Sequence, residues 1–392
     1  MKHQTFVLAT LCASPGLATA IELTDFTDPN TAFDEAYVDF NANVNSGNQD
    51  QTSYDALLTG FYNKRDSTDK RVVGLRVDGN LDASRGPNAA DDSVDDFGFS
   101  VRANRDAYFS ETREKLFYFI SGDYAHQDSA IDDNLGVSGG IGYGRVWNAT
   151  PLAKALRIQE ALLSHGLFTA DMSDDALLAL AAVIGREEEY QAREGFDVYR
   201  GVWYADMERV IIDSGVLAGE SLSALATVKL DEVLFDEPIS ARRHGWLVRA
   251  GAGVQSSDFA GLTDNDPKLT FQLEYAKPYG LKGQLIELAS YEPIFGDNTL
   301  QQFNNRLSYS YEISDRIDWV NAWELSFQQA DDADKTRFTT NTLSSSFLYH
   351  LTNQLDLGVT FAAVDSDDKP NLVASNDELS TSANLSLRYR VK

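Results

Sequence analysis

Charged side chains recur at alternate positions in several segments of the chain, where they would face one side of an extended strand. Mixed charges at close quarters create a transverse field that orients dipolar solutes in a water-filled pore. The same charges could instead pair across strands and brace a closed interior, and the sequence leaves both interpretations open. The candidate pore-lining residues are Arg76, Asp78, Arg102, Arg249, Lys268, Glu274, Arg306, Glu324 and Arg388.

Glycines recur at alternate positions on both sides of residues 149–242, a segment of different character. Glycine inside a strand often marks the close approach of another backbone. The intervening segment could therefore fold inward as a plug, although a simple bend in the strands would also use glycine. The candidate plug-contact residues are Gly140, Gly142, Gly144, Gly251 and Gly253. Their spacing does not match a dinucleotide-binding loop, which needs a third glycine further along and a strand-to-helix turn.

Metal and thiol chemistry find little support. The histidines beyond residue 20 are His126, His165, His244 and His350, and none has zinc-ligand spacing with another. Acidic runs such as 365–368 and 331–334 offer carboxylate oxygens to calcium, but they lack EF-hand spacing and are typical of solvated loops. The single cysteine, Cys12, lies in the predicted signal peptide. We therefore expect no cofactor and no resident metal.

The overall charge limits the classes of partner that the protein is expected to bind. The 392 residues hold 33 Lys and Arg against 60 Asp and Glu, a formal charge of −27, which disfavours binding to nucleic acid. No run of about 18 apolar residues could span a bilayer as a helix. Transmembrane β-strands remain possible, because they hide their lipid face in alternate residues.

Residues 1–20 have the features of a secretory signal peptide. A short positive start precedes the apolar run Phe6–Ala13, and Ala18-Thr19-Ala20 matches a cleavage site. We expect residues 21–148 and 243–392 to form the two parts of one β-domain, separated by a helical insert at 149–242.

Period-two alternation dominates both β regions, and turn-forming clusters separate the alternating segments. Counting the segments predicts about six strands before the insert and about eight after it, an all-β membrane barrel of about 14 antiparallel strands. The first strand, near Val38–Val44, should pair with the last, near Ala383–Val391. Expected outward residues include Phe97, Phe99, Phe271, Tyr275, Leu357, Val359 and Leu387.

Helical periodicity begins at Thr150, which we expect to cap a helix with Pro151 at its first position. Ser173 should cap a second helix, and further helices are expected near 199–212 and 221–234. Trp203, Met207 and Ile211 recur at i, i+4 and i+8 and should pack in a small core. The insert would thus be an all-α unit of about 80 residues between strands 6 and 7.

The connections between predicted strands alternate in character. One set, including Leu81–Asp96 and Asp365–Glu378, is longer and acidic, whereas the other, including Lys64–Arg71 and Leu351–Leu355, is shorter. Outer-membrane barrels have short periplasmic turns and long external loops. Six strands counted from a periplasmic start place the insert on the periplasmic side.

Three late segments, SYEISDRIDWVNAWELSF, SSSFLYHLTNQLDLGVTFAAV and STSANLSLRYRVK, resemble the last hairpins of porin-like Gram-negative outer-membrane β-barrels. They are similar to those of the salt-induced outer-membrane protein family. The chain ends on Lys392, whereas such barrels usually end on an aromatic residue read by the assembly machinery. His350-Leu351-Thr352 resembles the His-x-Ser of outer-membrane lipid A deacylases, with threonine replacing serine, but a periplasmic turn is far from that substrate.

The sequence therefore predicts an outer-membrane channel for small solutes, with the insert as plug, gate or periplasmic docking module. The alternative is a non-conducting anchor or scaffold for periplasmic, secretion or envelope-assembly partners. Expected partners are outer-membrane lipid, the outer-membrane assembly machinery and a periplasmic protein bound through the insert. Enzymatic activity is not expected.

Overall fold

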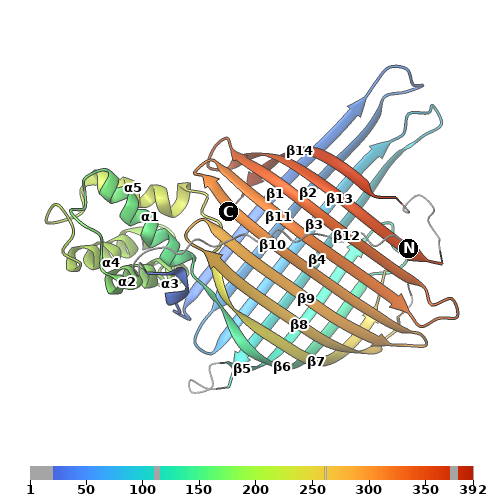
Figure 1. Cartoon of the computed structure of the whole chain (residues 1–392), viewed down its shortest axis with the longest axis horizontal. Coiled ribbons are helices and arrows are strands. Elements are labelled where there is room, and N and C mark those ends of the chain that lie inside the picture. The colour runs from blue at the N-terminus through green and yellow to red at the C-terminus, as the bar shows by residue number, and fades with distance from the viewer. Residues whose placement is uncertain (1–20, 110–114, 260, 262, 371–377, 392) are drawn as a thin grey trace, which may run out of the picture.

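Fourteen antiparallel strands form a closed barrel in which each strand pairs with its neighbours in sequence and β1 pairs with β14 (Figure 1). The computed structural model describes residues 21–109, 115–259, 261, 263–370 and 378–391; the predicted signal peptide at 1–20 lies outside them. The strands are β1 Thr31–Asn45, β2 Ser53–Ser67, β3 Arg71–Arg85, β4 Ser93–Tyr108, β5 Leu116–Gln127, β6 Asn134–Asn148, β7 Arg243–Ser257, β8 Asp266–Tyr279, β9 Gly283–Phe295, β10 Thr299–Ser314, β11 Ile317–Ala330, β12 Arg337–His350, β13 Leu355–Lys369 and β14 Ser380–Arg390. The predicted fold is confirmed.

Alternation sorts the side chains of these strands between two faces, as strand geometry requires. Phe97, Phe271 and Leu387 are each 43% exposed on the outer face, and Tyr275 and Leu357 are half-buried beside their cross-strand neighbours. The outer surface of the barrel is therefore apolar and aromatic, as the alternation predicted.

The seam between β1 and β14 is shorter than any other strand pairing in the described part of the chain. Only four residue pairs join these strands, from Tyr37↔Arg390 to Phe40↔Leu387, whereas fifteen pairs join β1 to β2. The later residues of β1, Asn41–Asn45, pair with β2 but not with β14. In Figure 1 the blue strands diverge from the red ones at the end of the barrel away from the helices.

The helical insert lies between β6 and β7. It contains α1 Thr150–Ser164, α2 Asp174–Ile184, α3 Glu187–Glu194, α4 Tyr199–Asp213, α5 Ala224–Asp231 and a π-helix, η3 Glu232–Asp236. Ser173 caps α2 by accepting a hydrogen bond from the Ala176 amide, as predicted. The capping predicted for Thr150 is wrong: this residue is already helical, and its amide donates to the side-chain oxygen of Asn148 at 3.0 Å.

One hydrophobic core holds the insert together. Trp203, Met207 and Ile211 are almost completely buried in it, as predicted, and the Trp203 indole donates to the Val183 carbonyl. Leu23 and Phe26, from the short 3-10 helix η1 Leu23–Asp25 and the residue after it, join the same core. Full burial of one large apolar side chain contributes roughly 1.5–3 kcal/mol, so the segment that precedes β1 is fastened to the insert.

The sequence left two placements open for the insert, inside the lumen as a plug or outside it. Figure 1 shows the helices beyond one end of the barrel, at the end where β1 begins and β14 ends. This is also the end that carries the short β2–β3 and β12–β13 turns.

Candidate functional site

The interior of the barrel contains two cavities lined by charged side chains. One has a volume of about 310 Å³ and is bordered by Arg76, Arg102, Arg249 and Glu274. The other, of about 420 Å³, shares the last three of these and adds Arg306 and Glu324. Six of the nine predicted pore-lining residues thus line these two cavities, which share part of their wall.

The remaining three candidates lie elsewhere on the inner face. Asp78 forms a two-point ion pair with Arg76 on the same strand. The Lys268 ammonium is buried between Gln255, Glu292 and Asp123, at 3.0, 3.4 and 3.6 Å. Arg388 donates to Asp39 at 2.7 Å across the β1–β14 seam. Lys268 and Arg388 thus pair across strands, which is the bracing arrangement that the sequence had left open, whereas Asp78 pairs within β3.

A cluster of three side chains crosses the interior near the helical end. Arg65 of β2 and Arg243 of β7 donate to the same carboxylate oxygen of Glu274, at 2.9 and 3.3 Å. Glu274 is 7% exposed, so both ion pairs are largely removed from water. Sequence reasoning missed Arg65, because Lys64–Arg71 was assigned to a turn; in the structure β2 continues to Ser67 and β3 starts at Arg71.

A second buried ion pair lies beside this cluster. The guanidinium of Arg249 donates twice to Asp106, at 3.1 and 2.6 Å, and Asp106 is completely buried. The same guanidinium lies over the ring of Phe117. Asp106 was not among the sequence candidates; its place on the inner face of β4, four residues after Arg102, was the available signal.

Contacts between strands that are not neighbours narrow the interior at the helical end. Arg145 of β6 donates to the Ser67 hydroxyl and the Thr68 carbonyl, at 2.9 and 2.6 Å, and so ties β6 to the β2–β3 turn. A small apolar cluster also lies in this part of the barrel, and Phe117 is fully buried in it. The members of the cluster are Val72, Tyr108, Phe117, Phe119, Val146, Leu247 and Ala276. This end of the barrel is packed with side chains around the 310 Å³ cavity, which Val72 and Val146 of the cluster also line, and the 420 Å³ cavity lies further along.

The plug-contact glycines adjoin barrel atoms. A Cβ placed on Gly142 would meet the Phe117 ring at 2.2 Å, and one on Gly251 would meet the Gly139 carbonyl at 2.5 Å. The closest atoms around Gly140 and Gly253 are likewise backbone atoms of the paired strand, and those around Gly144 belong to Trp246 and Leu247. In this arrangement the glycines make room for the β6–β7 pairing and for the aromatic rings of β5. A plug at these positions stays a prediction without support from their surroundings.

His350 has a local structural explanation. Its Nδ1 lies 2.7 Å from Asp356, and its Nε2 lies 3.4 Å from Asp318. The Thr352 hydroxyl accepts hydrogen bonds from the amides of Gln354 and Leu355, and so closes the β12–β13 turn. Both side chains are engaged in holding the turn and its flanking strands. In the described part of the chain, no three His, Cys, Asp or Glu side chains are grouped to hold a metal ion.

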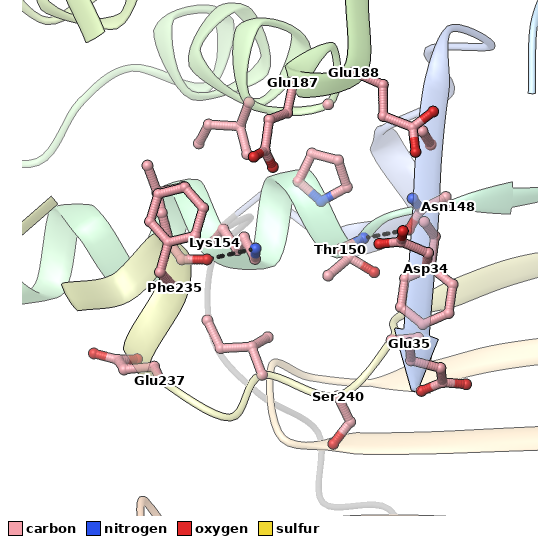
Figure 2. Close-up of a pocket in the computed structure, with 18 of the residues that line it drawn as sticks. Asp34, Glu35, Asn148, Thr150, Lys154, Glu187, Glu188, Phe235, Glu237 and Ser240 are labelled. Atoms are coloured by element: carbon pink, nitrogen blue, oxygen red, sulfur yellow. Dashed lines mark hydrogen bonds between the residues drawn. The ribbon is translucent and has the colours of Figure 1, made fainter. Parts of the chain in front are cut away.

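A third cavity, of about 270 Å³, lies where the insert meets the start of β1. Figure 2 shows Asp34 and Glu35 on one side of it, and Glu187 and Glu188 on another. The ammonium of Lys154 donates to the Leu234 carbonyl at 2.9 Å. Burial lowers the pKa of Lys154, and the nearby Glu187 partly opposes that effect.

Ion pairs attach the insert to opposite sides of the barrel end. Lys64 of β2 binds Glu188 of α3 at 3.0 Å. Arg157 of α1 binds Glu312 of β10, and Arg242 lies 3.8 Å from the same carboxylate. Since β2 and β10 lie on different sides of the barrel, the insert is attached to this end on two sides rather than at one edge.

Comparison with known proteins gives a remote structural likeness. No protein-family model and no curated protein sequence matches the chain. Similar solved structures include the outer membrane channel DcaP of Acinetobacter baumannii, at 8% identity over 92% of this chain and 96% of that one, with a TM-score of 0.37. Others are the COG4313 outer membrane channel of Pseudomonas putida F1 (9%, 95% and 99%, TM-score 0.31) and OmpF of Salmonella typhi in complex with daunomycin (8%, 93% and 98%, TM-score 0.34).

At such TM-scores the fold assignment rests on the strand pairing of this chain itself, and the site on its own residues. None of the helices that the structure describes combines the length and the hydropathy that a bilayer-spanning helix needs.

Proposed function

We propose that this chain is a bacterial outer-membrane channel for small solutes, whose helical insert covers the periplasmic mouth. The observation that carries the proposal is the pair of adjoining, charge-lined cavities inside a closed barrel with an apolar outer face. Barrels of eight strands are just filled by side chains, and wider ones leave a lumen. Fourteen strands are enough for an aqueous path.

The outer surface supports location in the outer membrane. Large apolar side chains such as Phe271, Leu343 and Leu385 lie exposed on it, which would be costly in water and is required in lipid. Outer-membrane lipid and the assembly machinery are accordingly the expected partners. Membership of the salt-induced outer-membrane protein family stays a prediction, carried by the last hairpins.

The helical insert is proposed as a cover and docking module on the periplasmic side. It extends beyond the barrel end and exposes apolar side chains, among them Phe196 at 79% and Val198 at 60%. A periplasmic protein could bind there without entering the lumen.

A non-conducting anchor is the second candidate. The observation that favours it is the packing at the helical end, where the Arg65–Glu274–Arg243 cluster and the Arg145 contacts cross the interior. If these side chains seal the lumen, the barrel would only hold the insert in place for periplasmic partners.

Planar-bilayer recordings of the whole chain decide between the two. They should be paired with a variant in which a short turn joins Asn148 directly to Arg243; these residues are register partners on β6 and β7, so the strands stay aligned. A channel covered by the insert predicts small conductance from the whole chain and larger conductance from the variant. If neither form conducts, the anchor is favoured. If both forms conduct equally well, the barrel is a channel but the insert does not cover it.

A further inference from the structure

The lining of the two luminal cavities is richer in positive charge than the chain as a whole. Six arginines border the two luminal cavities, although the chain carries a net charge of −27. Their ion-pair partners are only four carboxylates, because Arg65 and Arg243 share Glu274 and Arg102 has no ion pair among the described residues. The six arginines are Arg65, Arg76, Arg102, Arg243, Arg249 and Arg306, and the four carboxylates are Asp78, Asp106, Glu274 and Glu324. Lys64, at the edge of the first cavity, is paired with Glu188.

Arg102 is the clearest source of this excess of positive charge. It lies directly opposite Arg76 across the β3–β4 pair, and like charges in that relation repel each other. Its opposite residue on β5 is Asp123, but that carboxylate turns to Lys268 and Asn134, at 3.6 and 3.3 Å. Among the described residues Arg102 has neither an ion pair nor a hydrogen bond through its side chain. An exposed guanidinium therefore points into both cavities with its donors free.

Arg249 offers a second, fixed donor to the same space. Two hydrogen bonds to Asp106 set the plane of its guanidinium, and its remaining terminal nitrogen approaches the Gln272 side-chain oxygen at 3.4 Å. Arg249 and Gln272 border both cavities together with Arg102. A ligand that reached Arg102 would therefore find a second guanidinium already oriented.

The walls of the first cavity also include apolar side chains. Phe33, Val72 and Val146 line it alongside the arginines. Such a lining suits a solute with one anionic head and a small apolar body better than a fully hydrated inorganic ion.

We propose that the lumen contains a binding site for small organic carboxylates, with Arg102 as its principal contact and Arg249 as the supporting one. A planar guanidinium presents paired N–H donors that match the two oxygens of a carboxylate. The inference deepens the proposed channel function by naming a solute class, but binding can be tested whether or not the protein conducts.

The test is isothermal titration of the purified whole chain in detergent with butyrate. Butyramide, which has the same body without charge, and inorganic phosphate, which has charge without the apolar body, are titrated alongside. We expect saturable binding of butyrate and at least tenfold weaker binding of both comparison solutes. The variant Arg102→Gln should weaken butyrate binding about tenfold, because it removes a charge-assisted pair. Arg102→Lys keeps the positive charge but loses the paired N–H donors of the guanidinium, so its affinity for butyrate should lie between those of the unaltered protein and Arg102→Gln.

Arg209→Gln is the matched control, because it removes the same charge from a side chain that is 70% exposed on the helical insert. It should bind butyrate like the unaltered protein. Equal binding of butyrate and butyramide, or equal loss in Arg102→Gln and Arg209→Gln, would overturn the proposal. If phosphate bound as tightly as butyrate, the site would be one for inorganic oxyanions. That result would contradict the inference that the apolar side chains of the first cavity select a solute with an apolar body. Recordings on the same samples report conduction separately, so a silent barrel that binds butyrate disproves the channel and not the site.

Discussion

Arg65 and Glu274 meet inside the barrel at 2.9 Å, although β3 to β7 lie between their strands along the wall. Arg243, on the strand beside Glu274, shares the same carboxylate oxygen. The interior near the helical end is thus held by ion pairs that join distant parts of the wall as well as by the ladder of backbone hydrogen bonds.

Glu274→Gln should destabilise the barrel strongly. The change leaves Arg65 and Arg243 facing each other without a carboxylate, and breaking a buried ion pair costs about 3–5 kcal/mol. Thermal unfolding in detergent, followed by the heat-modified mobility of the barrel on gels, measures the loss. Glu324→Gln is the comparison, because its pair with Arg306 is about half exposed and should contribute less than about 1 kcal/mol. Similar shifts in the two variants would show that the cross-lumen cluster does not stabilise the barrel.

The short β1–β14 seam predicts a specific pattern of hydrogen exchange. The Ala36 carbonyl accepts from the Val391 amide, so even-numbered residues of β1 turn their backbone groups toward β14. Beyond Phe40 this strand has no β14 partner, and the amides of Ala42 and Val44 face the open seam. They should exchange rapidly in micelles, whereas Asn41 and Asn43, which face β2, should be protected. Equal protection of all four amides would mean that the seam closes.

Much of the fold could be predicted from the sequence, because it depends on local patterns. Alternation located the strands, and Ser173 with the apolar spacing around Trp203 located the helices. The interior contacts could not be predicted in the same way. Asp106 and Arg249 are 143 residues apart, and their pairing depends on how the wall curves rather than on either neighbourhood. The end of β2 was missed for a related reason. Its charged residues are typical of a turn, and the ion pair of Arg65 with Glu274 on β8 forms only in the folded barrel.

The topology can be tested with protease on intact cells. We expect the helical insert to be spared from outside, because it lies at the end of the barrel where β1 begins and β14 ends, which in outer-membrane barrels is periplasmic. A protease site introduced in the β3–β4 loop at Pro87 should be cut, because that loop lies at the opposite end. Cleavage of the insert from outside, with the Pro87 site protected, would mean that the orientation is inverted.

Glu237 should make the attachment of the insert sensitive to pH. Burial raises the pKa of this carboxyl, Arg157 lowers it, and Asp315 and Glu312 raise it further. A raised pKa in the folded state means that ionisation disfavours that state, so stability falls as the pH rises through the folded pKa and is recovered below the unfolded value. Glu237→Gln should therefore stabilise the insert at neutral pH and have no effect at low pH. Thermal loss of helical circular dichroism measures this, with exposed Glu220→Gln as the control; a constant difference at all pH values would contradict the assignment.

Ion selectivity should be modest, favour cations and depend on salt. The loops at the end away from the insert are acidic, so cations should be concentrated at that mouth, while the luminal arginines oppose their passage. The Debye length falls from about 10 Å at 0.1 M salt to about 3 Å at 1 M, so the contribution of the mouth should fade. Reversal potentials under potassium chloride gradients should give a permeability ratio of a few-fold at low salt, approaching unity at high salt.

Replacing Asp92 and Asp95 with asparagine should lower the ratio at low salt only, because both side chains are exposed at the mouth. Replacing the exposed Asp213 and Glu220 of the insert with their amides removes the same charge at the other end. If that control changes the ratio as much, selectivity is set at the covered mouth and the acidic loops are not its source.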